Sequence, residues 1–304
     1  MPVRIGVIGS ANMDLVTQVP HAPGPGENVR GRDIREIPGG KGANQAVGVA
    51  RLGAECLFVG KVGSDGFGGA LRENLRREGV NVSYLRTESG CSSGIALIMV
   101  DGGGQNSIVV CPGANGRLRP EDIEPLREEL SLLDAMVVQL EIPIDTVARV
   151  IAIGEELEVP VILDAGPPLH EAPDELFRVA VLSPNEAEAA ALAGRPVRDL
   201  KDAESVARLF MERGAGAVVL KLGDKGALLV AEGVVEHFPA HKVEVVDTTA
   251  AGDAFTAALA VFQAEGKSLR EAVALANRAG ALAATRLGAQ PSMPTRAEVE
   301  QFRA

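Results

Sequence analysis

The chain has 304 residues, and its 30 Lys and Arg against 41 Asp and Glu give a formal net charge of −11. This acidic balance argues against nucleic acid and against an anionic membrane surface as partners, because both repel negative charge. The hydrophobic fraction of 46% and the charged fraction of 23% are those of a globular protein, and the length suits one large domain with a small appendage.

The cysteines and the apolar runs bear on the cellular compartment. Cys56, Cys91 and Cys111 are odd in number and far apart, which fits reduced thiols better than a disulfide framework, and we expect all three to be small buried side chains. The apolar stretch from residue 5 to 11 is too short for a signal peptide, and no apolar run reaches the length of a membrane span. We therefore expect a cytoplasmic protein without membrane contact.

Hydrophobic patterning predicts an alternation of strands and helices. The predicted strands are residues 3–8, 56–59, 95–100, 108–111, 135–140, 159–163, 179–182 and 217–220. The predicted helices are residues 41–52, 67–78, 145–157, 186–193, 203–213, 252–264 and 269–287. This alternation implies an α/β fold, a three-layer α/β/α sandwich with a mostly parallel central sheet.

A small β appendage interrupts the alternation. Residues 14–38 are rich in Pro and Gly and contain short, half-exposed strands, and the strands at 95–100 and 108–111 flank the turn Asp101-Gly102-Gly103-Gly104. We therefore expect one domain over residues 1–304, with a β-sheet lid formed by about 14–38 and 94–111. Ligands of such sheets bind at the carboxyl ends of the strands, so functional residues should follow strands.

The most specific segment runs from Val245 to Phe255, a strand end that passes through small residues into a helix. Small residues allow backbone amides to converge on an anion, and the helix N-terminus adds partial positive charge. Asp253 falls in the first helical turn, close to where a phosphate would rest. An isolated Asp there would be an ordinary helix cap, but capping requires neither Gly252 nor the preceding Asp247.

This segment resembles the C-terminal signature of the ribokinase family of sugar kinases. The resemblance implies that Asp253 is the catalytic base. It implies an anion hole formed by the amides of Ala250, Ala251, Gly252 and Asp253. The chemistry agrees, because phosphoryl transfer requires mainly positioning and charge stabilisation, with a carboxylate to accept the proton of the attacking hydroxyl.

A second motif, residues 39–46, reads Gly-Gly-Lys-Gly-Ala-Asn-Gln-Ala. Alone it predicts only a tight connection, and it fits neither a P-loop nor a dinucleotide fingerprint. It closely resembles the sugar-binding motif of ribokinases, in which Asn44 would bond to sugar hydroxyls. The further sugar-binding positions implied by the resemblance are Asn12, Asp14, Gly39, Gly40, Lys41 and Glu141. Without the resemblance, Asn12 and Asp14 would be turn formers and Glu141 an unremarkable strand end.

The ATP and magnesium positions are also implied by the resemblance. Asn185 and Glu188 lie three apart at a helix start and face the same way, which alone would indicate only a favourable acidic N-terminus. In the family such a pair helps to place Mg²⁺ and the phosphates, mostly through water. The other implied nucleotide contacts are Lys221, Leu222, Gly223, Asp224, Gly226, Gly252 and, beside the adenine, Asn277. Residues 221–226 could equally be a turn between strands, and Asn277 could face solvent.

A monovalent cation site is the last implied feature. The residues 288–292, Gly-Ala-Gln-Pro-Ser, resemble the segment that encloses K⁺ in ribokinases, and carbonyl and hydroxyl oxygens suit such a hard ion. The implied ligands, mostly through backbone carbonyls, are Asp247, Thr249, Ala283, Arg286, Gly288 and Ser292.

The motifs occur in family order from Asn12 to Ser292, so the resemblance implies an ATP-dependent kinase acting on the 5-hydroxyl of D-ribose. The β-sheet lid would cover the sugar and exclude water, and its exposed apolar face implies a homodimer through the lid.

Two departures from the family pattern leave alternatives open. Residues 164–168 read Asp-Ala-Gly-Pro-Pro where ribokinases usually carry a segment like Asn-Pro-Ala-Pro, and Ala257 replaces a common Gly. A kinase of the same family acting on fructose, 2-keto-3-deoxygluconate or a nucleoside therefore remains possible. A non-catalytic sugar or nucleotide sensor would lack the base, but Asp253 is present. A dinucleotide-dependent dehydrogenase would require a glycine fingerprint that this chain lacks.

Overall fold

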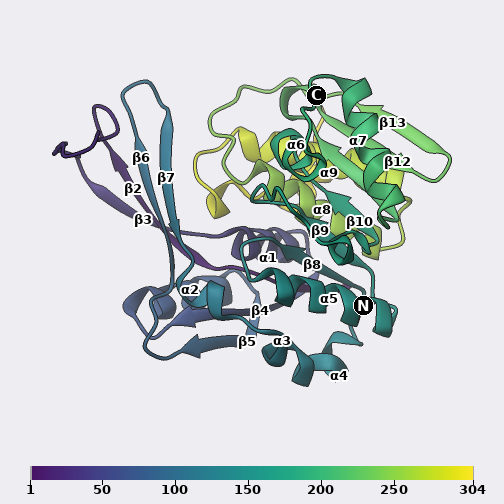
Figure 1. The fold of residues 1–304 in the computed structure, drawn as a ribbon, viewed down its shortest axis with the longest axis horizontal. Helices are drawn as coiled ribbons and strands as arrows, with labels where there is room; N and C mark the ends of the chain where they lie inside the picture. Colours follow the sequence, from purple (N-terminus) through teal and green to yellow (C-terminus); the bar gives the residue numbers. More distant parts are fainter. Residues whose placement is uncertain (1, 304) are drawn as a thin grey trace.

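The computed structural model describes residues 2–303 and confirms the predicted fold class. A nine-stranded sheet has the order β13-β12-β11-β10-β9-β8-β1-β4-β5, with helices on both faces, and a separate four-stranded sheet has the order β3-β2-β6-β7 (Figure 1). The strands of the main sheet are β1 Arg4–Ile8, β4 Glu55–Gly63, β5 Asn81–Glu88, β8 Ala135–Gln139, β9 Val161–Asp164, β10 Val181–Ser183, β11 Ala217–Lys221, β12 Ala227–Ala231 and β13 Val234–Phe238.

The main sheet is parallel from β5 to β11, and β12 and β13 are added antiparallel at one edge. Its inner strands are apolar on both faces, as expected for a parallel sheet covered by two helix layers. In β8, for example, Val137 packs into one core, while Met136 and Val138 pack into the other.

The helices divide between these two cores. One core contains side chains of α1, α2, α8, α9 and α10, and the other contains side chains of α3, α4, α5, α6 and α7. The helix bounds are α1 Lys41–Arg51, α2 Gly66–Arg77, α3 Pro120–Ile123, α4 Arg127–Leu130, α5 Ile144–Leu157, α6 Glu186–Ala193, α7 Leu200–Glu212, α8 Ala251–Ala264, α9 Leu269–Ala284 and α10 Arg296–Gln301. None of the helices within residues 2–303 is long and apolar enough to cross a membrane.

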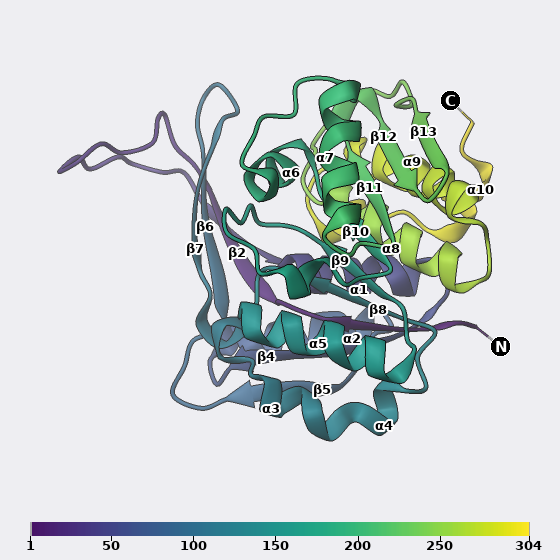
Figure 2. The same ribbon diagram turned by 45° about the vertical axis from the view of Figure 1, so that its right-hand side comes forward.

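The four-stranded sheet, called the small sheet below, projects from the main body in both views (Figures 1 and 2). It consists of β2 Asn12–Gln18, β3 Ile34–Gly39, β6 Gly94–Val100 and β7 Asn106–Cys111. Strand β2 pairs parallel with β6, whereas β3 and β7 pair antiparallel at the two edges. The small sheet therefore joins two segments of the chain, which continue directly from the ends of β1 and β5.

Several element boundaries differ from the sequence-based expectation. Helix α7 begins at Leu200, three residues before the predicted start, because the Asp199 side chain accepts a hydrogen bond from the amide of Asp202 and caps the helix. Helix α9 ends at Ala284, not at residue 287. The predictions also omitted β5, β12, β13 and the short helices α3, α4 and α10. The half-exposed pattern of β5 explains its omission, and α3, α4 and α10 are too short, at 4, 4 and 6 residues, to show a helical period.

The expectation that all three cysteines are buried is wrong. Cys56 is buried in β4, Cys91 is half-buried, and Cys111 is exposed. Cys111 ends β7, the edge strand of the small sheet, where the main core does not reach. The last side chain of such an edge strand is open to solvent, which the apolar sequence of residues 108–111 does not reveal.

Candidate functional site

The carboxyl edge of the main sheet is lined by buried polar residues. Strands β8, β9, β10 and β11 each end in one, namely Gln139, Asp164, Ser183 and Lys221, of which the first three are fully buried. Helices α1 and α8, which pack against each other and against β8, begin at the same edge. The parallel topology therefore brings four strand ends and two helix N-termini to one place.

Asp253 lies at the centre of this edge and is 4% exposed. Its Oδ2 accepts a hydrogen bond of 2.9 Å from Nδ2 of Asn44, and its Oδ1 accepts one of 3.1 Å from Nε2 of Gln45. Burial raises the pKa of the Asp253 carboxyl, and the nearby positive charge of Lys41 opposes that shift. The result is an oriented carboxylate of increased basicity, as a proton acceptor requires.

The N-terminus of α8 beside Asp253 is open to an anion. Ala250 adopts a left-handed conformation with φ of 59°, and the helix has no side-chain cap. The amide of Ala251 donates a hydrogen bond to the carbonyl of Thr248. Uncapped amides and the positive end of the helix dipole are suited to the negative oxygens of a phosphoryl group.

Lys41, at the start of α1, supplies a positive charge between three carboxylates. Its Nζ lies 3.7 Å from Asp164, 3.8 Å from Asp253 and 3.9 Å from Glu188. Burial alone would lower the pKa of the Lys41 ammonium, but these carboxylates outweigh burial and raise it. The backbone amide of Lys41 donates to Oε2 of Glu141, which also accepts from the Ser10 hydroxyl, so Glu141 holds the start of α1 in place.

The start of the small sheet lies close to Asp253 and Glu141. Asn12 is buried, and its Oδ1 accepts a 2.7 Å hydrogen bond from Nδ2 of Asn115. Asp14 is half-buried, and burial, followed by the negative charges of Glu141 and Asp253, raises its pKa from 3.8 to about 7. The structure thus places Asn12 and Asp14 at the junction between the two sheets, beside the acidic residues of the main sheet edge.

The glycine pair before α1 makes this junction possible. A Cβ at Gly39 would collide with the carboxylate of Asp14, and one at Gly40 would lie 2.8 Å from the amide nitrogen of Asn12. Gly40 also has φ of 88°, a conformation that glycine adopts without strain. Gly40 therefore requires glycine for a steric reason that is independent of any ligand, whereas a side chain at Gly39 would displace the carboxylate of Asp14.

Asn185 and Glu188 form a reciprocal cap at the start of α6. Oδ1 of Asn185 accepts from the Glu188 amide at 2.9 Å, and Oε2 of Glu188 accepts from the Asn185 amide at 2.7 Å. Both side chains therefore stabilise the start of the helix as a capping box. Capping uses Oε2 of Glu188, whereas its Oε1 atom points toward Nζ of Lys41. Glu188 is 2% exposed, whereas Asn185 is exposed.

Residues 221–226 form a turn between β11 and β12, with the amide of Leu222 donating to the carbonyl of Gly226. The Lys221 ammonium turns inward to Asp164, at 3.1 Å, and lies near the position where a Cβ of Gly252 would be. Leu222 is buried, while Gly223 and Asp224 are exposed. Of this turn, Lys221 therefore reaches the buried residues around Asp253 and Asp164, called the Asp253 cluster below.

Asn277 is engaged away from that cluster. Its Nδ2 donates a 2.8 Å hydrogen bond to the carbonyl of Pro239, which ties α9 to the segment after β13. This contact accounts for a half-buried polar side chain in an otherwise alanine-rich helix.

Two of the predicted cation ligands, Thr249 and Gly288, contact a third, Asp247. Its Oδ1 accepts from the amide and the hydroxyl of Thr249, at 2.9 and 2.6 Å, and its Oδ2 accepts from the amide of Gly288 at 2.9 Å. Burial alone would raise the pKa of Asp247, but these donors outweigh it and lower the pKa. Ala283 and Ser292 are buried, while the Arg286 side chain pairs with Glu298. The fold therefore joins the segments before α8 and after α9.

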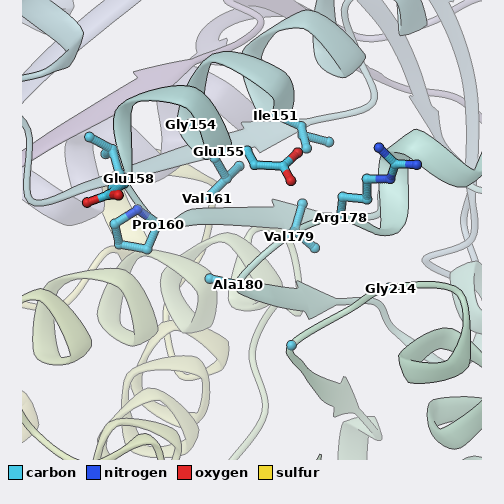
Figure 3. A pocket seen from close by; sticks show the side chains of 12 residues that line it. Ile151, Gly154, Glu155, Glu158, Pro160, Val161, Arg178, Val179, Ala180 and Gly214 are labelled. Carbon is cyan, nitrogen blue, oxygen red and sulfur yellow. The ribbon is translucent and has the colours of Figure 1, made fainter.

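Within residues 2–303, no three or more His, Cys, Asp or Glu side chains are arranged to hold a metal ion. A cavity of about 440 Å³ lies elsewhere, at the amino ends of β9 and β10, where it is bordered by Glu155, Glu158 and Arg178 (Figure 3). It contains none of the residues predicted from the sequence motifs.

The geometry can be compared with known proteins. The pfkB family model of carbohydrate kinases matches residues 4–296. This chain belongs to the pfkB family of carbohydrate kinases.

Relatives of this kinase cover essentially its whole length. It is 40% identical to the ribokinase of Bacillus subtilis over 98% of this chain and 99% of that protein. It is 35% identical to the deoxyribokinase of Salmonella typhimurium over 98% of this chain and 97% of the relative. The structure of Arabidopsis thaliana ribokinase complexed with ribose and ATP superposes with a TM-score of 0.93 at 35% identity, covering both chains completely.

Several residues of the kinase site were missed by the sequence reasoning. They are Ser10, Gln45, Asn115, Gln139, Ser183 and Thr256, and Asp164 was noted only as a departure from the family pattern. Most of them are the last residues of strands or lie inside helices, whereas we expected functional residues in loops after strands. A polar residue ending an otherwise apolar strand is the signal that could have found Gln139, Asp164 and Ser183.

The raised pKa of Asp14 predicts a pH-dependent change in stability. An unfolded chain loses this proton near pH 3.8 and the folded kinase near pH 7, so ionisation of Asp14 destabilises the fold increasingly as the pH rises through this interval. Asp14→Asn should therefore increase the free energy of unfolding more at pH 8 than at pH 5, as measured by chemical denaturation. Glu36→Gln, an exposed carboxylate on the neighbouring strand, is the matched control. An equal gain at both pH values would contradict the prediction.

Proposed function

We propose that the chain is an ATP-dependent kinase that transfers a phosphoryl group to the 5-hydroxyl of D-ribose and forms D-ribose 5-phosphate. The observation that carries the proposal is the buried carboxylate of Asp253 at the uncapped start of α8, oriented by Asn44 and adjacent to Lys41. The ribokinases among its full-length relatives, one of them solved with ribose and ATP, support ribose as the acceptor.

In this mechanism Asp253 is the general base. The 5-hydroxyl oxygen forms a bond to the terminal phosphorus of ATP while the bond from that phosphorus to the bridging oxygen breaks, and the electron pair leaves with ADP. Asp253 accepts the hydroxyl proton. The ammonium of Lys41 and the amides of residues 250–253 stabilise the charge on the transferred group, and the amide of Ala251 would leave the carbonyl of Thr248 to take part.

The sugar is held where the small sheet meets the main body. We assign its hydroxyl contacts to Asn12, Asp14, Asn44 and the backbone of Gly39 and Gly40. Oδ1 of Asn44 is buried and has no partner within residues 2–303, so it is free to accept from a hydroxyl. The small sheet then acts as a lid that excludes water from the transferring group.

The nucleotide phosphates lie beside Lys41, Lys221 and Glu188 in this proposal, and the turn at 223–226 borders the nucleotide. Mg²⁺ neutralises charge on the phosphates of ATP when it is bound. The Oε1 atom of Glu188 fits such a role, because capping uses only its Oε2. Asn185 would act through water, and Asn277 would border the adenine, with its amide already donating to Pro239.

We also assign a K⁺ site to the loop around Asp247. The cluster fits an ion of single charge, because one carboxylate of lowered pKa is surrounded by a hydroxyl and by backbone segments rather than by further carboxylates. Asp247, Thr249 and Ser292 would contribute side-chain or backbone oxygens, and Ala283, Arg286 and Gly288 backbone carbonyls. The bound ion would stabilise the segment that leads into α8.

A cytoplasmic location follows from the proposed use of ATP and agrees with the three free cysteines.

A second acceptor is favoured by one specific observation. A full-length relative at 35% identity is a deoxyribokinase, so 2-deoxyribose belongs among the substrates to be tested.

The function is tested by measuring ADP release from MgATP with D-ribose, 2-deoxyribose, fructose, 2-keto-3-deoxygluconate and adenosine. We expect the highest kcat/KM with ribose. Asp253→Asn should lower kcat by about 10² to 10⁴ because the proton acceptor is lost, while ribose binding by calorimetry is retained. Preference for another acceptor would change the assigned substrate, and near-normal turnover by Asp253→Asn would remove this residue as the base. No turnover with any acceptor would favour a sensor.

The cation site predicts a K⁺ dependence that is specific to Asp247. Replacing a large organic cation by K⁺ should increase both kcat and the midpoint of thermal unfolding, because an ion that binds only the folded protein stabilises it. Asp247→Asn should weaken both responses by at least about tenfold in the K⁺ concentration required, since one charged ligand is lost. Glu232→Gln, in the exposed turn between β12 and β13, is the control. Equal K⁺ responses in all three proteins would exclude the site.

We further propose that two copies associate through the small sheet. Large apolar side chains on it are exposed, namely Ile34, Leu97, Ile108, Val109 and Val110. Side chains at 108 and 109 point to opposite faces of β7, and exposure above 50% at both positions leaves a large apolar surface in water.

This association predicts a dimer at micromolar concentration in sedimentation velocity. Charges at Ile108→Lys or Val109→Lys, one on each face of the small sheet, should weaken it by at least about tenfold, because an unpaired ammonium would be buried. Leu132→Lys, equally exposed but outside the small sheet, should remain a dimer. A monomeric wild type, or dimers of unchanged strength in both small-sheet variants, would refute the proposal.

A further inference from the structure

Gln45 is fully buried and joins two carboxylates that lie far apart in the sequence. Its Nε2 donates to Oδ1 of Asp253 at 3.1 Å and to Oδ2 of Asp164 at 3.0 Å. Its Oε1 accepts a 2.6 Å hydrogen bond from Nε2 of Gln139. All polar atoms of the Gln45 amide are therefore engaged, which fixes its orientation.

Asp164, the second carboxylate bound by Gln45, is fixed in place by several further hydrogen bonds. It is 0% exposed, and its Oδ2 also accepts from Nζ of Lys221 at 3.1 Å and from Oγ1 of Thr256 at 3.0 Å. Its Oδ1 accepts from the amide of Gly166 at 3.2 Å. Burial alone would raise the pKa of Asp164, but Lys221 and Lys41 outweigh it and lower the pKa. Asp164 is therefore a fixed acceptor at the end of β9.

The two hydrogen atoms of the Gln45 amide are consequently divided between the two carboxylates. A rotation of the Asp253 side chain would break a hydrogen bond to an ionised group, and the amide could not follow without leaving Asp164. Asn44, the other partner of Asp253, has an unpartnered buried Oδ1 and is assigned to the sugar. Gln45 is not assigned to the sugar, so its hydrogen bond to Asp253 can persist throughout the reaction.

We propose that Gln45 is a positioning residue for phosphoryl transfer, anchored by Asp164, that holds the Asp253 carboxylate in the orientation for accepting the hydroxyl proton. The inference deepens the proposed function and rests on Asp253 as the general base. It assigns a role to two buried residues that neither the helix packing nor the substrate contacts explain.

The test is Gln45→Met, which keeps the length of the side chain and removes all three hydrogen bonds of the amide, those with Asp253, Asp164 and Gln139. We expect kcat with MgATP and the preferred acceptor to fall about 10- to 100-fold, the loss of one hydrogen bond to a charged group, with the acceptor KM changed less than about twofold. Thr146→Val is the matched control, because Thr146 is equally buried and donates one hydrogen bond, to the carbonyl of Leu118, outside the site. It should leave kcat unchanged at a similar cost in thermal stability.

A double-mutant cycle separates positioning from structural damage. If Gln45 acts through Asp253, Gln45→Met should reduce the residual kcat of the Asp253→Asn variant less than about twofold. General damage to the site would reduce it by the same factor as in the wild-type background, and would overturn the proposal. Asp164→Asn should also lower kcat, and its effect should be less than additive with Gln45→Met. Full additivity would exclude Asp164 as the anchor.

The outcomes distinguish this inference from the proposed function. Absence of turnover by the wild-type chain, or full activity of Asp253→Asn, would overturn the proposed function. An active wild type that loses activity with Asp253→Asn but not with Gln45→Met would overturn the role of Gln45 alone.

Discussion

The burial of two carboxylates, Asp164 and Asp253, at one edge of a parallel sheet is the constraint on which the rest of the site depends. An ionised carboxylate without partners is costly to remove from water, so each must be surrounded by donors or cations. Lys41, Lys221 and Gln45 meet this requirement; Lys41 and Gln45 both lie on α1, and Lys221 lies at the end of β11. The polar residues at this edge are therefore mutually dependent, because each buried carboxylate draws on several of them at once.

The topology of the main sheet makes this arrangement possible. Parallel strands place all of their carboxyl ends at one edge, where β8, β9, β10 and β11 end in polar residues. Helices α1 and α8 begin at the same edge and bring partial positive charge from their backbones. Carboxylates and an anion-binding helix start thus coexist at short range, and Lys41 keeps the carboxylates from repelling a bound phosphate.

The small sheet adds a different constraint, which is steric. Gly39 and Gly40 allow the chain to pass from β3 into α1 directly against β2, so that Asp14 and Asn12 lie beside the residues of the main sheet. The energetic consequence is visible at Asp14, whose ionisation is opposed by its surroundings. A site that concentrates negative charge for binding hydroxyl groups is thereby less stable without its ligand than an apolar equivalent would be.

The amino-acid sequence by itself determined the fold class and the central motif of this kinase. The alternation of apolar strands with helices indicated the parallel sheet, because burial on both faces leaves a continuous apolar pattern. The segment around Asp253 and the motif around Asn44 pointed to phosphoryl transfer to a sugar through their resemblance to the motifs of the ribokinase family. Those features are local, and each is contained within about a dozen residues.

Only the tertiary structure decided which residues act together. The hydrogen bond from Asn44 to Asp253 spans 209 positions, and that from Gln45 to Asp164 spans 119. No local pattern contains such a pairing, so Gln45 was overlooked and Asp164 was noted only as a departure from a familiar motif. The exposure of Cys111 was missed for a similar reason, because the burial of a side chain depends on whether other parts of the fold pack over its strand. Hydrogen bonding and burial are properties of distances in space, and the chain must fold before those distances exist.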